Sequence, residues 1–270
     1  MNIPDFTLGE RLTDEQMAFF DAQGFIRFRG VANEPECVAL SNALEKLSDK
    51  WNKEDRKTAL GIPIQWGLKP NGKRYVQRFA YSSHYSQVVA DFCTSDRFEP
   101  VRRLCGEDAR LAQTEKDGVV VNDFINDEGS RWKRLGWHTD GLRDLFYLTL
   151  PEPMLNVGLY LDDCPTEKGG VRLIPGTHTQ GFWSMAFGKA YFLDHRSDPR
   201  EIALTARRGD LTIHDGRLWH RTEQAEIEGP ASRRRTMYMA FVDGPERLRD
   251  ENSKAPFYHR LRGWVSGRSV

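Results

Sequence analysis

The sequence predicts one domain that is mainly β, with helices packed outside an antiparallel β-sandwich or barrel. Helical patterns occupy about the first 110 residues, and short segments rich in β-branched residues follow from Val119 onward. This order is typical of a sandwich or barrel flanked by helices. A chain of 270 residues is long enough to bury a substantial core in a single domain of this kind.

The N-terminal part is expected to hold three helices and one strand. The spacing of apolar residues predicts helices over Thr13–Ala22 and Glu34–Ser48, with Thr13 or the next residue as the N-cap of the first. Phe25–Phe28 is predicted to be a strand between them. A third helix is predicted over Gln87–Cys105, broken or restarted at its proline.

The second half of the chain is predicted to form the sheets. Its candidate strands are short, rich in residues that favour β-structure and bounded by Gly, Pro or Asp. They are Val119–Ile125, Asn156–Leu161, Val171–Ile174, Ile202–Thr205, Leu211–His214 and Thr236–Val242.

Two stretches fit neither pattern. Leu60–Ser86 is rich in Gly, Pro and aromatic residues, and Gly181–Arg200 carries five aromatic residues between two predicted strands. Long irregular connections in a compact domain often serve as lids or binding loops. The alternative is a helical decoration whose aromatic side chains fill a satellite core. The sequence leaves both interpretations open.

Composition excludes several classes of partner. Lys and Arg together number 39, as do Asp and Glu, so the formal net charge is zero and no overall field attracts nucleic acid or an anionic membrane. No apolar run is long enough to span a bilayer, and the polar start of the chain does not resemble a secretory signal. The four cysteines are scattered without a Cys-x-x-Cys pair, which favours a reduced, cytoplasmic setting over a disulfide framework.

His138, Asp140 and His220 form the candidate catalytic centre. Residues i and i+2 of an extended strand point to the same side, so His138 and Asp140 can reach one metal ion together. Two imidazoles and one carboxylate on one face of an octahedral ion are the ligand set of non-haem Fe(II) oxygenases. Taken alone, a His-x-Asp spacing also occurs by chance on surface strands, and the surrounding motifs therefore matter.

An ordered series of motifs surrounds these three residues. It comprises Leu12–Gln16, Gly24–Gly30, Leu135–Gly141, Asn156–Asp163, Glu167–His178, Arg208–Asp215 and Leu218–Thr222. In this order the series resembles the phytanoyl-CoA dioxygenase family of Fe(II)/2-oxoglutarate-dependent oxygenases, over about residues 10–245.

The resemblance implies a fold and a set of cofactors. It implies a double-stranded β-helix, or jelly-roll, core over about residues 111–245, after a helical part over about 1–110 and before a C-terminal tail at 246–270. It also implies Fe(II) held by His138, Asp140 and His220, with 2-oxoglutarate and O2 as cosubstrates. Because halogenating relatives lack the carboxylate, Asp140 favours insertion of oxygen over halogenation.

The distal carboxylate of 2-oxoglutarate needs a buried cation, and a guanidinium offers the matching bidentate fork. Family members carry this arginine on the strand after the distal histidine, where Arg234 is the first candidate and Arg235 the second. Alternation lets only one of the two face inward. The stretch 226–230 resembles an insertion and leaves the choice open. The resemblance adds Thr222 as a hydroxyl that helps to hold the same carboxylate.

Three further positions bear on the site. Asn122 is expected to point inward with its alternating neighbours, and a buried amide needs a partner, which a cosubstrate or a core residue can supply. Gly158 stands where the family often has an aromatic residue, which predicts a roomier pocket there. His214 competes with His220 as a metal ligand. We interpret it as a sheet residue that at most supports the ligands.

The resulting prediction is a dioxygenase that hydroxylates a small-molecule substrate, without nucleic-acid or membrane partners and with no readable oligomeric state. Desaturation, cyclisation or epimerisation at the same iron site is one alternative, and a non-catalytic jelly-roll binding protein is another. If Arg143, Arg217 and Arg221 line the entrance, the substrate is polar or anionic, whereas the aromatic loops suit an apolar scaffold equally well.

Overall fold

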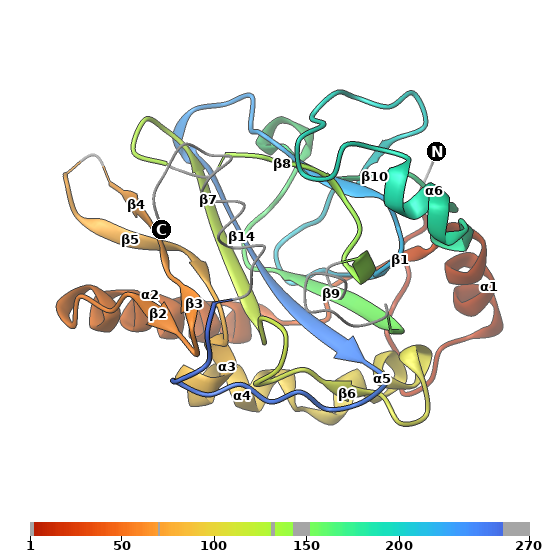
Figure 1. Ribbon diagram of the computed structural model, residues 1–270, viewed down its shortest axis with the longest axis horizontal. Coiled ribbons are helices and arrows are strands. Elements are labelled where there is room, and N and C mark those ends of the chain that lie inside the picture. The colour runs from red at the N-terminus through yellow and green to blue at the C-terminus, as the bar shows by residue number, and fades with distance from the viewer. Residues whose placement is uncertain (1–2, 70, 131–132, 143–151, 256–270) are drawn as a thin grey trace.

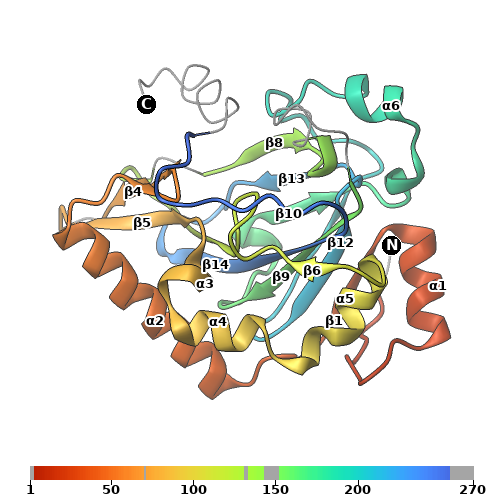
Figure 2. The same cartoon turned by 60° about the horizontal axis from the view of Figure 1, so that its bottom comes forward.

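A computed structural model describes residues 3–69, 71–130, 133–142 and 152–255. Two antiparallel sheets face each other, and helices cover the far side of the larger one, so the molecule has three layers (Figures 1 and 2). The prediction of a mainly β core with flanking helices is confirmed. None of the helices in these ranges is long and apolar enough to cross a membrane.

The larger sheet has eight strands in the order β1-β12-β9-β14-β7-β5-β4, with β6 also pairing with β14. Its strands are β1 (Phe25–Phe28), β4 (Gln65–Leu68), β5 (Arg74–Phe79), β6 (Arg110–Leu111), β7 (Val120–Asn126), β9 (Met154–Tyr160), β12 (Leu211–Asp215) and β14 (Gly229–Val242). The smaller sheet has the order β11-β10-β13-β8. Its strands are β8 (Leu135–His138), β10 (Gly170–Leu173), β11 (Ile202–Ala203) and β13 (His220–Glu223), and a separate hairpin joins β2 (Thr58–Ala59) to β3 (Ile62–Pro63).

The α-helices are α1 (Asp14–Gln23), α2 (Glu34–Lys53), α3 (Ser82–Tyr85), α4 (Gln87–Cys93), α5 (Glu99–Cys105) and α6 (Phe182–Phe187). Short 3-10 turns are η1 (Asp96–Phe98), η3 (Thr166–Lys168) and η4 (Thr177–Thr179). Thr13 caps α1 through a complete capping box, as predicted. The third predicted helix is divided into α4 and α5. Its break lies before Pro100, because proline fits the first turn of α5, where no intrahelical N–H bond is lost.

The main core lies between the outer face of the larger sheet and helices α2 and α4 (Figure 2). Alternation along each strand sends one set of side chains into this core. The set includes Val121, Leu155, Val157, Leu159, Leu211, Ile213, Met237, Met239 and Phe241, which pack with Leu40, Leu44, Trp51, Val89 and Phe92. The alternate residues of the same strands therefore face the smaller sheet.

The stretch 60–86 is not the irregular loop that its composition suggested. It contains β3, β4, β5 and α3, and β5 joins the larger sheet by pairing Arg78 with Asn122 and Phe79 with Val121. Only a distant partner strand completes the hydrogen bonds of β5, and local composition does not report such a partner.

Strand β14 begins earlier than predicted, at Gly229. Its register with β7 shifts between Gly229 and Arg234. Gly229 pairs with Asn126 and Arg234 pairs with Phe124, so β14 advances by five residues where β7 advances by two. The suspected insertion 226–230 thus lies mostly before β14, the irregularity falls between Gly229 and Arg234, and the strand beyond Arg234 keeps regular pairing.

Candidate active site

His138, Asp140 and His220 come together between the two sheets. His138 ends β8 and His220 begins β13, and the two residues are direct cross-strand partners. Asp140 follows β8 by two residues. One donor atom from each of the three buried residues lies within 4.8 Å of the other two. A carboxylate and two imidazoles this close form a ligand set that fits Fe(II).

Backbone carbonyls orient both imidazoles. Nδ1 of His138 lies 2.8 Å from the carbonyl oxygen of Gly136, and Nδ1 of His220 lies 3.0 Å from that of Leu218. A carbonyl only accepts, so Nδ1 carries the proton and Nε2 of a neutral ring offers its lone pair to a metal. Burial, with His138 and His214 nearby, holds the pKa of His220 well below its usual value, which keeps this ring neutral.

Asp140 is held from the larger sheet. Asn156, on β9, donates a hydrogen bond of 2.7 Å from Nδ2 to Oδ2 of Asp140. The same oxygen lies 3.6 Å from Nε2 of His220 and 3.7 Å from Nε2 of His214. The carboxylate therefore has a fixed orientation toward the two rings.

His214 is a residue of the larger sheet, as the sequence predicted, and it lies beside the candidate metal ligands. It lies on β12 beside Asn156, and its ring centroid is 4.5 Å from that of His220. It is fully buried, and within the described chain neither of its ring nitrogens has a hydrogen-bond partner. A buried polar group without a partner is costly, which indicates that a polar ligand belongs next to the three candidate metal ligands.

A cavity opens from the three residues along the inner face of the larger sheet. Asn122 lines it together with Val120 and Phe124, as alternation predicted, and Thr222 lines it from the smaller sheet. The wall of the same cavity also carries Gln65, Gln77, Arg78, Lys116 and Asp117.

Arg234 lies on the inner face of β14, and the structure buries its guanidinium. Nη2 donates to the carbonyl oxygen of Glu223 at 2.8 Å and Nη1 to that of Lys168, and the cation packs over the ring of Phe124 at 4.9 Å. Burial lowers the pKa of Arg234, and no carboxylate within the described ranges forms an ion pair with it. Such a cation fits the distal carboxylate of 2-oxoglutarate.

Arg235 points to the opposite face of the same strand. Its Nε and Nη2 atoms each lie 2.8 Å from a carboxylate oxygen of Asp162, and Nη1 lies 3.7 Å from Glu45 on α2. The pleat of β14 thus sends the two side chains to opposite faces of the larger sheet. Arg234 faces the cavity side and Arg235 faces the helices.

The expectation of extra room at Gly158 is wrong. A Cβ atom on Gly158 would lie 2.9 Å from the ring of Tyr238, its partner on β14, and 3.2 Å from Oγ1 of Thr212. The ring of Tyr238, which lines the cavity, occupies the space over this glycine. An aromatic side chain is therefore present here, supplied by the neighbouring strand.

Arg217 and Arg221, two of the arginines considered for the entrance, are not among the described residues that line the cavity. Arg217 is bound to Asp215, and Arg221 is bound to Glu201 and Glu223. Arg143 lies outside the described residues. The charged wall comes instead from Arg78, which donates to Asp117 at 2.7 Å, and from Lys116. Because Arg78 reaches the site through the unpredicted pairing of β5, no local motif marked it.

A jelly-roll whose two sheets enclose two histidines and an aspartate defines the class of non-haem iron oxygenases that bind a 2-oxo acid. The family described as phytanoyl-CoA dioxygenase (PhyH) matches residues 20–234. The chain belongs to this family, whose members use Fe(II) and 2-oxoglutarate.

Solved structures show the same fold. HygX from Streptomyces hygroscopicus, with nickel and 2-oxoglutarate bound, is 22% identical, with 86% of this chain and 87% of that chain covered and a TM-score of 0.60. The carbocyclase SnoK from nogalamycin biosynthesis is 19% identical, with 90% and 89% covered and a TM-score of 0.64. The epimerase SnoN, in complex with Fe3+, alpha ketoglutarate and nogalamycin RO, is 17% identical, with 89% and 87% covered and a TM-score of 0.59. No curated protein sequence matched the chain.

Proposed function

We propose that this Fe(II)/2-oxoglutarate-dependent dioxygenase hydroxylates a small-molecule substrate and that His138, Asp140 and His220 are its iron ligands. The observation that carries the proposal is the meeting of these three buried donors within 4.8 Å at one end of a cavity. When bound, Fe(II) and 2-oxoglutarate activate O2, release succinate and CO2, and supply the oxidant for a C–H bond.

The chain itself contributes orientation and charge balance around the metal. The Gly136 and Leu218 carbonyls keep the Nε2 atoms of the two histidines available as ligands. Asn156 holds the carboxylate of Asp140, and His214 offers a buried ring nitrogen to any polar group beside it.

Arg234 and Thr222 are the residues that we propose to hold the distal carboxylate of 2-oxoglutarate. Support comes from the buried guanidinium of Arg234 and from Thr222, two residues beyond His220 on the cavity wall. Asn122, on the same wall, is proposed as a further polar contact of the cosubstrate. Arg235, which binds Asp162 on the other face, is not needed for this role.

The substrate is proposed to be a polar small molecule. Apart from Asp140, the charged residues of the cavity wall are Arg78, Lys116 and Asp117, accompanied by the amides of Gln65 and Gln77. Polar groups on a substrate can form further hydrogen bonds with such a wall, whereas an apolar scaffold would desolvate its charged groups and offer no hydrogen bond in return.

The first test is anaerobic titration of the metal-free protein with Fe(II) and then with 2-oxoglutarate, followed by the visible charge-transfer band of the chelate. We expect the band in the wild type and its loss or displacement in Asp140→Asn. Asp123→Asn is the matched control, because Asp123 is equally buried but binds Arg233 on the outer face of the larger sheet. No band in the folded wild type would contradict the proposal.

Product analysis separates the possible outcomes at the same centre. Hydroxylation adds one oxygen atom to the substrate, desaturation or cyclisation removes two hydrogens, and epimerisation leaves the mass unchanged. A folded protein that binds small molecules without taking up Fe(II) would instead be a jelly-roll binding protein.

A cytoplasmic location is also proposed. All four cysteines are free thiols, and Cys37, Cys93 and Cys164 are buried in the core. Free, buried thiols are typical of proteins that fold in a reducing compartment. Labelling of cell fractions with an antibody against the protein tests this location directly.

A further inference from the structure

The residues that precede the two candidate iron histidines carry a second set of contacts. Alternation turns His138 and His220 into the cavity and turns Trp137 and Trp219 to the outside of the smaller sheet. Both indoles are buried there in a separate apolar cluster with Ile174 and Tyr191. Within the stretch 181–200, Tyr191 packs against these indoles and Phe192 lines the cavity, whereas Phe182, Trp183 and Phe187 are exposed.

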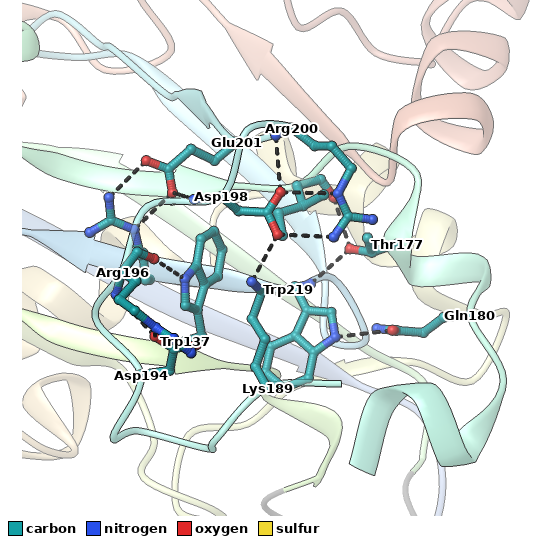
Figure 3. Close-up of polar contacts among 12 residues, drawn as sticks. Trp137, Thr177, Gln180, Lys189, Asp194, Arg196, Asp198, Arg200, Glu201 and Trp219 are labelled. Atoms are coloured by element: carbon teal, nitrogen blue, oxygen red, sulfur yellow. Dashed lines mark hydrogen bonds and ion pairs between the residues drawn. The ribbon is translucent and has the colours of Figure 1, made fainter. Parts of the chain in front are cut away.

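Both indole N–H groups are anchored in this outer layer. Trp137 donates from Nε1 to the carbonyl oxygen of Arg196 at 2.8 Å, and Trp219 donates to Oε1 of Gln180 at 3.0 Å (Figure 3). Nζ of Lys189 lies 4.4 Å from the ring centroid of Trp137 and 2.9 Å from a carboxylate oxygen of Asp198. One ion pair thus closes the segment 189–201 over the indole of Trp137.

The segment 189–201 also covers the backbone of β8, which is the edge strand of its sheet. The N–H of Phe192 donates to the carbonyl oxygen of Trp137 at 2.8 Å, and the N–H of Trp137 donates to that of Asp194 at 2.8 Å. Tyr191 donates its hydroxyl to the carbonyl oxygen of Thr139. The residues on both sides of His138 are consequently bonded to this one segment.

The contact is tight at Gly136, whose carbonyl oxygen orients His138. A Cβ atom there would come closer than 3.0 Å to main-chain atoms of Phe192 and Asp194. Phe192 itself has a φ of 62°, a left-handed backbone that a bulky residue rarely adopts. Its ring centroid lies 4.9 Å from that of His138, and the side chain lines the cavity. Strain of this kind is held in place by its surroundings and marks functional positions.

We infer that the segment 189–201 positions the iron ligand His138 from the outer side of β8. The Lys189–Asp198 ion pair holds this segment in place, and Phe192 contacts the ring of His138. The inference rests on the proposed function, because it presumes that His138 binds iron. Lys189, Asp198 and Trp137 are positioning residues, since they act through the backbone of β8 and do not touch the cavity.

Substitution of Lys189 tests this role of the ion pair, and substitution of Arg200, which binds the same carboxylate, is the matched control. Lys189 and Arg200 both lie 2.9 Å from Asp198, but the side chain of Lys189 is 12% exposed and that of Arg200 is 69% exposed. We expect Lys189→Met to weaken anaerobic Fe(II) binding about tenfold, at the low end of losses seen when support of a metal ligand is removed. Arg200→Met should change it less than about twofold, as is usual for an exposed pair.

The d–d absorption of bound Co(II) reports ligand geometry independently of turnover. We expect it to change in Lys189→Met and to be restored, with the Fe(II) affinity, in Lys189→Arg. Gly136→Ala, which displaces Phe192, should weaken Fe(II) binding about 10- to 100-fold. If it does not fold, the lysine variants still decide the matter.

Thermal unfolding completes the test. A merely structural role of the ion pair would lower the melting temperature of Lys189→Met and leave both the Fe(II) dissociation constant and the Co(II) spectrum as in the wild type. That result would overturn the inference. Absence of Fe(II) binding in the wild type would instead overturn the proposed function, so the two failures are distinguishable.

Discussion

The two sheets differ in how they hold the side chains that face the cavity. The larger sheet presents polar side chains on its inner face, such as Arg234, Asn122 and Asn156, and strand pairing on both sides holds them in register. The smaller sheet presents His138 and His220 from strands of four residues each, with β8 at its edge. Regular strand pairing orders the wall that we propose to bind 2-oxoglutarate, whereas strand β8, which carries the candidate iron ligand His138, is also bonded to an irregular segment outside the sheet.

This comparison predicts that 2-oxoglutarate binding and Fe(II) binding can be weakened independently by different substitutions. The largest effect is expected in Arg234→Met, which removes a buried, charge-assisted anchor. The affinity for 2-oxoglutarate should fall about 100-fold, as for the loss of two hydrogen bonds to a charged group. Fe(II) affinity without 2-oxoglutarate should remain as in the wild type. Arg233→Met is the control, because Arg233 binds Asp123 on the outer face. Equal loss in both variants would contradict the assignment.

Asn156 is a residue of the larger sheet that binds a candidate iron ligand, Asp140, so its substitution is expected to affect Fe(II) binding. Asn156→Ala removes the 2.7 Å hydrogen bond to Asp140, and we expect Fe(II) affinity to fall about tenfold, as for other residues that hold a metal ligand. Asn126→Ala removes a similarly buried amide that binds Ala225 and Ile227. It should reduce stability and spare the metal. Metal titration of both variants measures the difference, and unchanged binding in Asn156→Ala would refute the role.

Gly158→Ala probes the packing of the cosubstrate wall. The new methyl group meets the ring of Tyr238 at 2.9 Å, so this ring must move. We expect a loss of about 1–3 kcal/mol in unfolding free energy, typical of overpacking, and a several-fold loss of 2-oxoglutarate affinity. Denaturant unfolding and titration measure the two effects. Full wild-type affinity would mean that Tyr238 does not bound the cosubstrate site.

The smallest effect concerns pH and the outer segment. Hydrogen bonds from Arg200 and Lys189 hold the pKa of Asp198 below its usual value of 3.8. A lowered carboxyl pKa stabilises the folded state above the unfolded-state pKa, and this contribution is lost as the pH falls through the folded-state value. The destabilisation caused by Lys189→Met, at most about 1 kcal/mol, should therefore be constant from about pH 8 to pH 5 and shrink below about pH 4. Urea unfolding across this range tests the prediction, and a difference that grows toward low pH would contradict it.

Much of the site was predictable because its signals are local. The alternation that places His138 beside Asp140, and Asn122 on the inner face, follows from strand geometry alone. Local signals also predicted the strand Phe25–Phe28 and an N-cap at Thr13 or the next residue. Motif order supplied the rest, namely the family, the cofactors and the candidate ligand His220.

The parts that escaped prediction depend on distant partners. The stretch 60–86 carries turn residues throughout, yet β5 forms a hairpin with β4 and joins the larger sheet by pairing with β7. Tyr238 fills the space over Gly158 only because the register of β14 and β9 sets the two opposite each other. His214 was judged by its sequence neighbours, and its place beside Asp140 follows from the pairing of β12 with β9.

The sequence by itself therefore determined the class of fold, the family and the identity of the candidate iron ligands, since these follow from residue types at short, regular spacings. Only the tertiary structure placed Arg234 and Arg235 on opposite faces of β14, brought Arg78 to the cavity and joined the segment 189–201 to the backbone on both sides of His138. Each of these depends on contacts between residues far apart in the chain, and such contacts are set by strand register and side-chain packing, which local spacing does not encode.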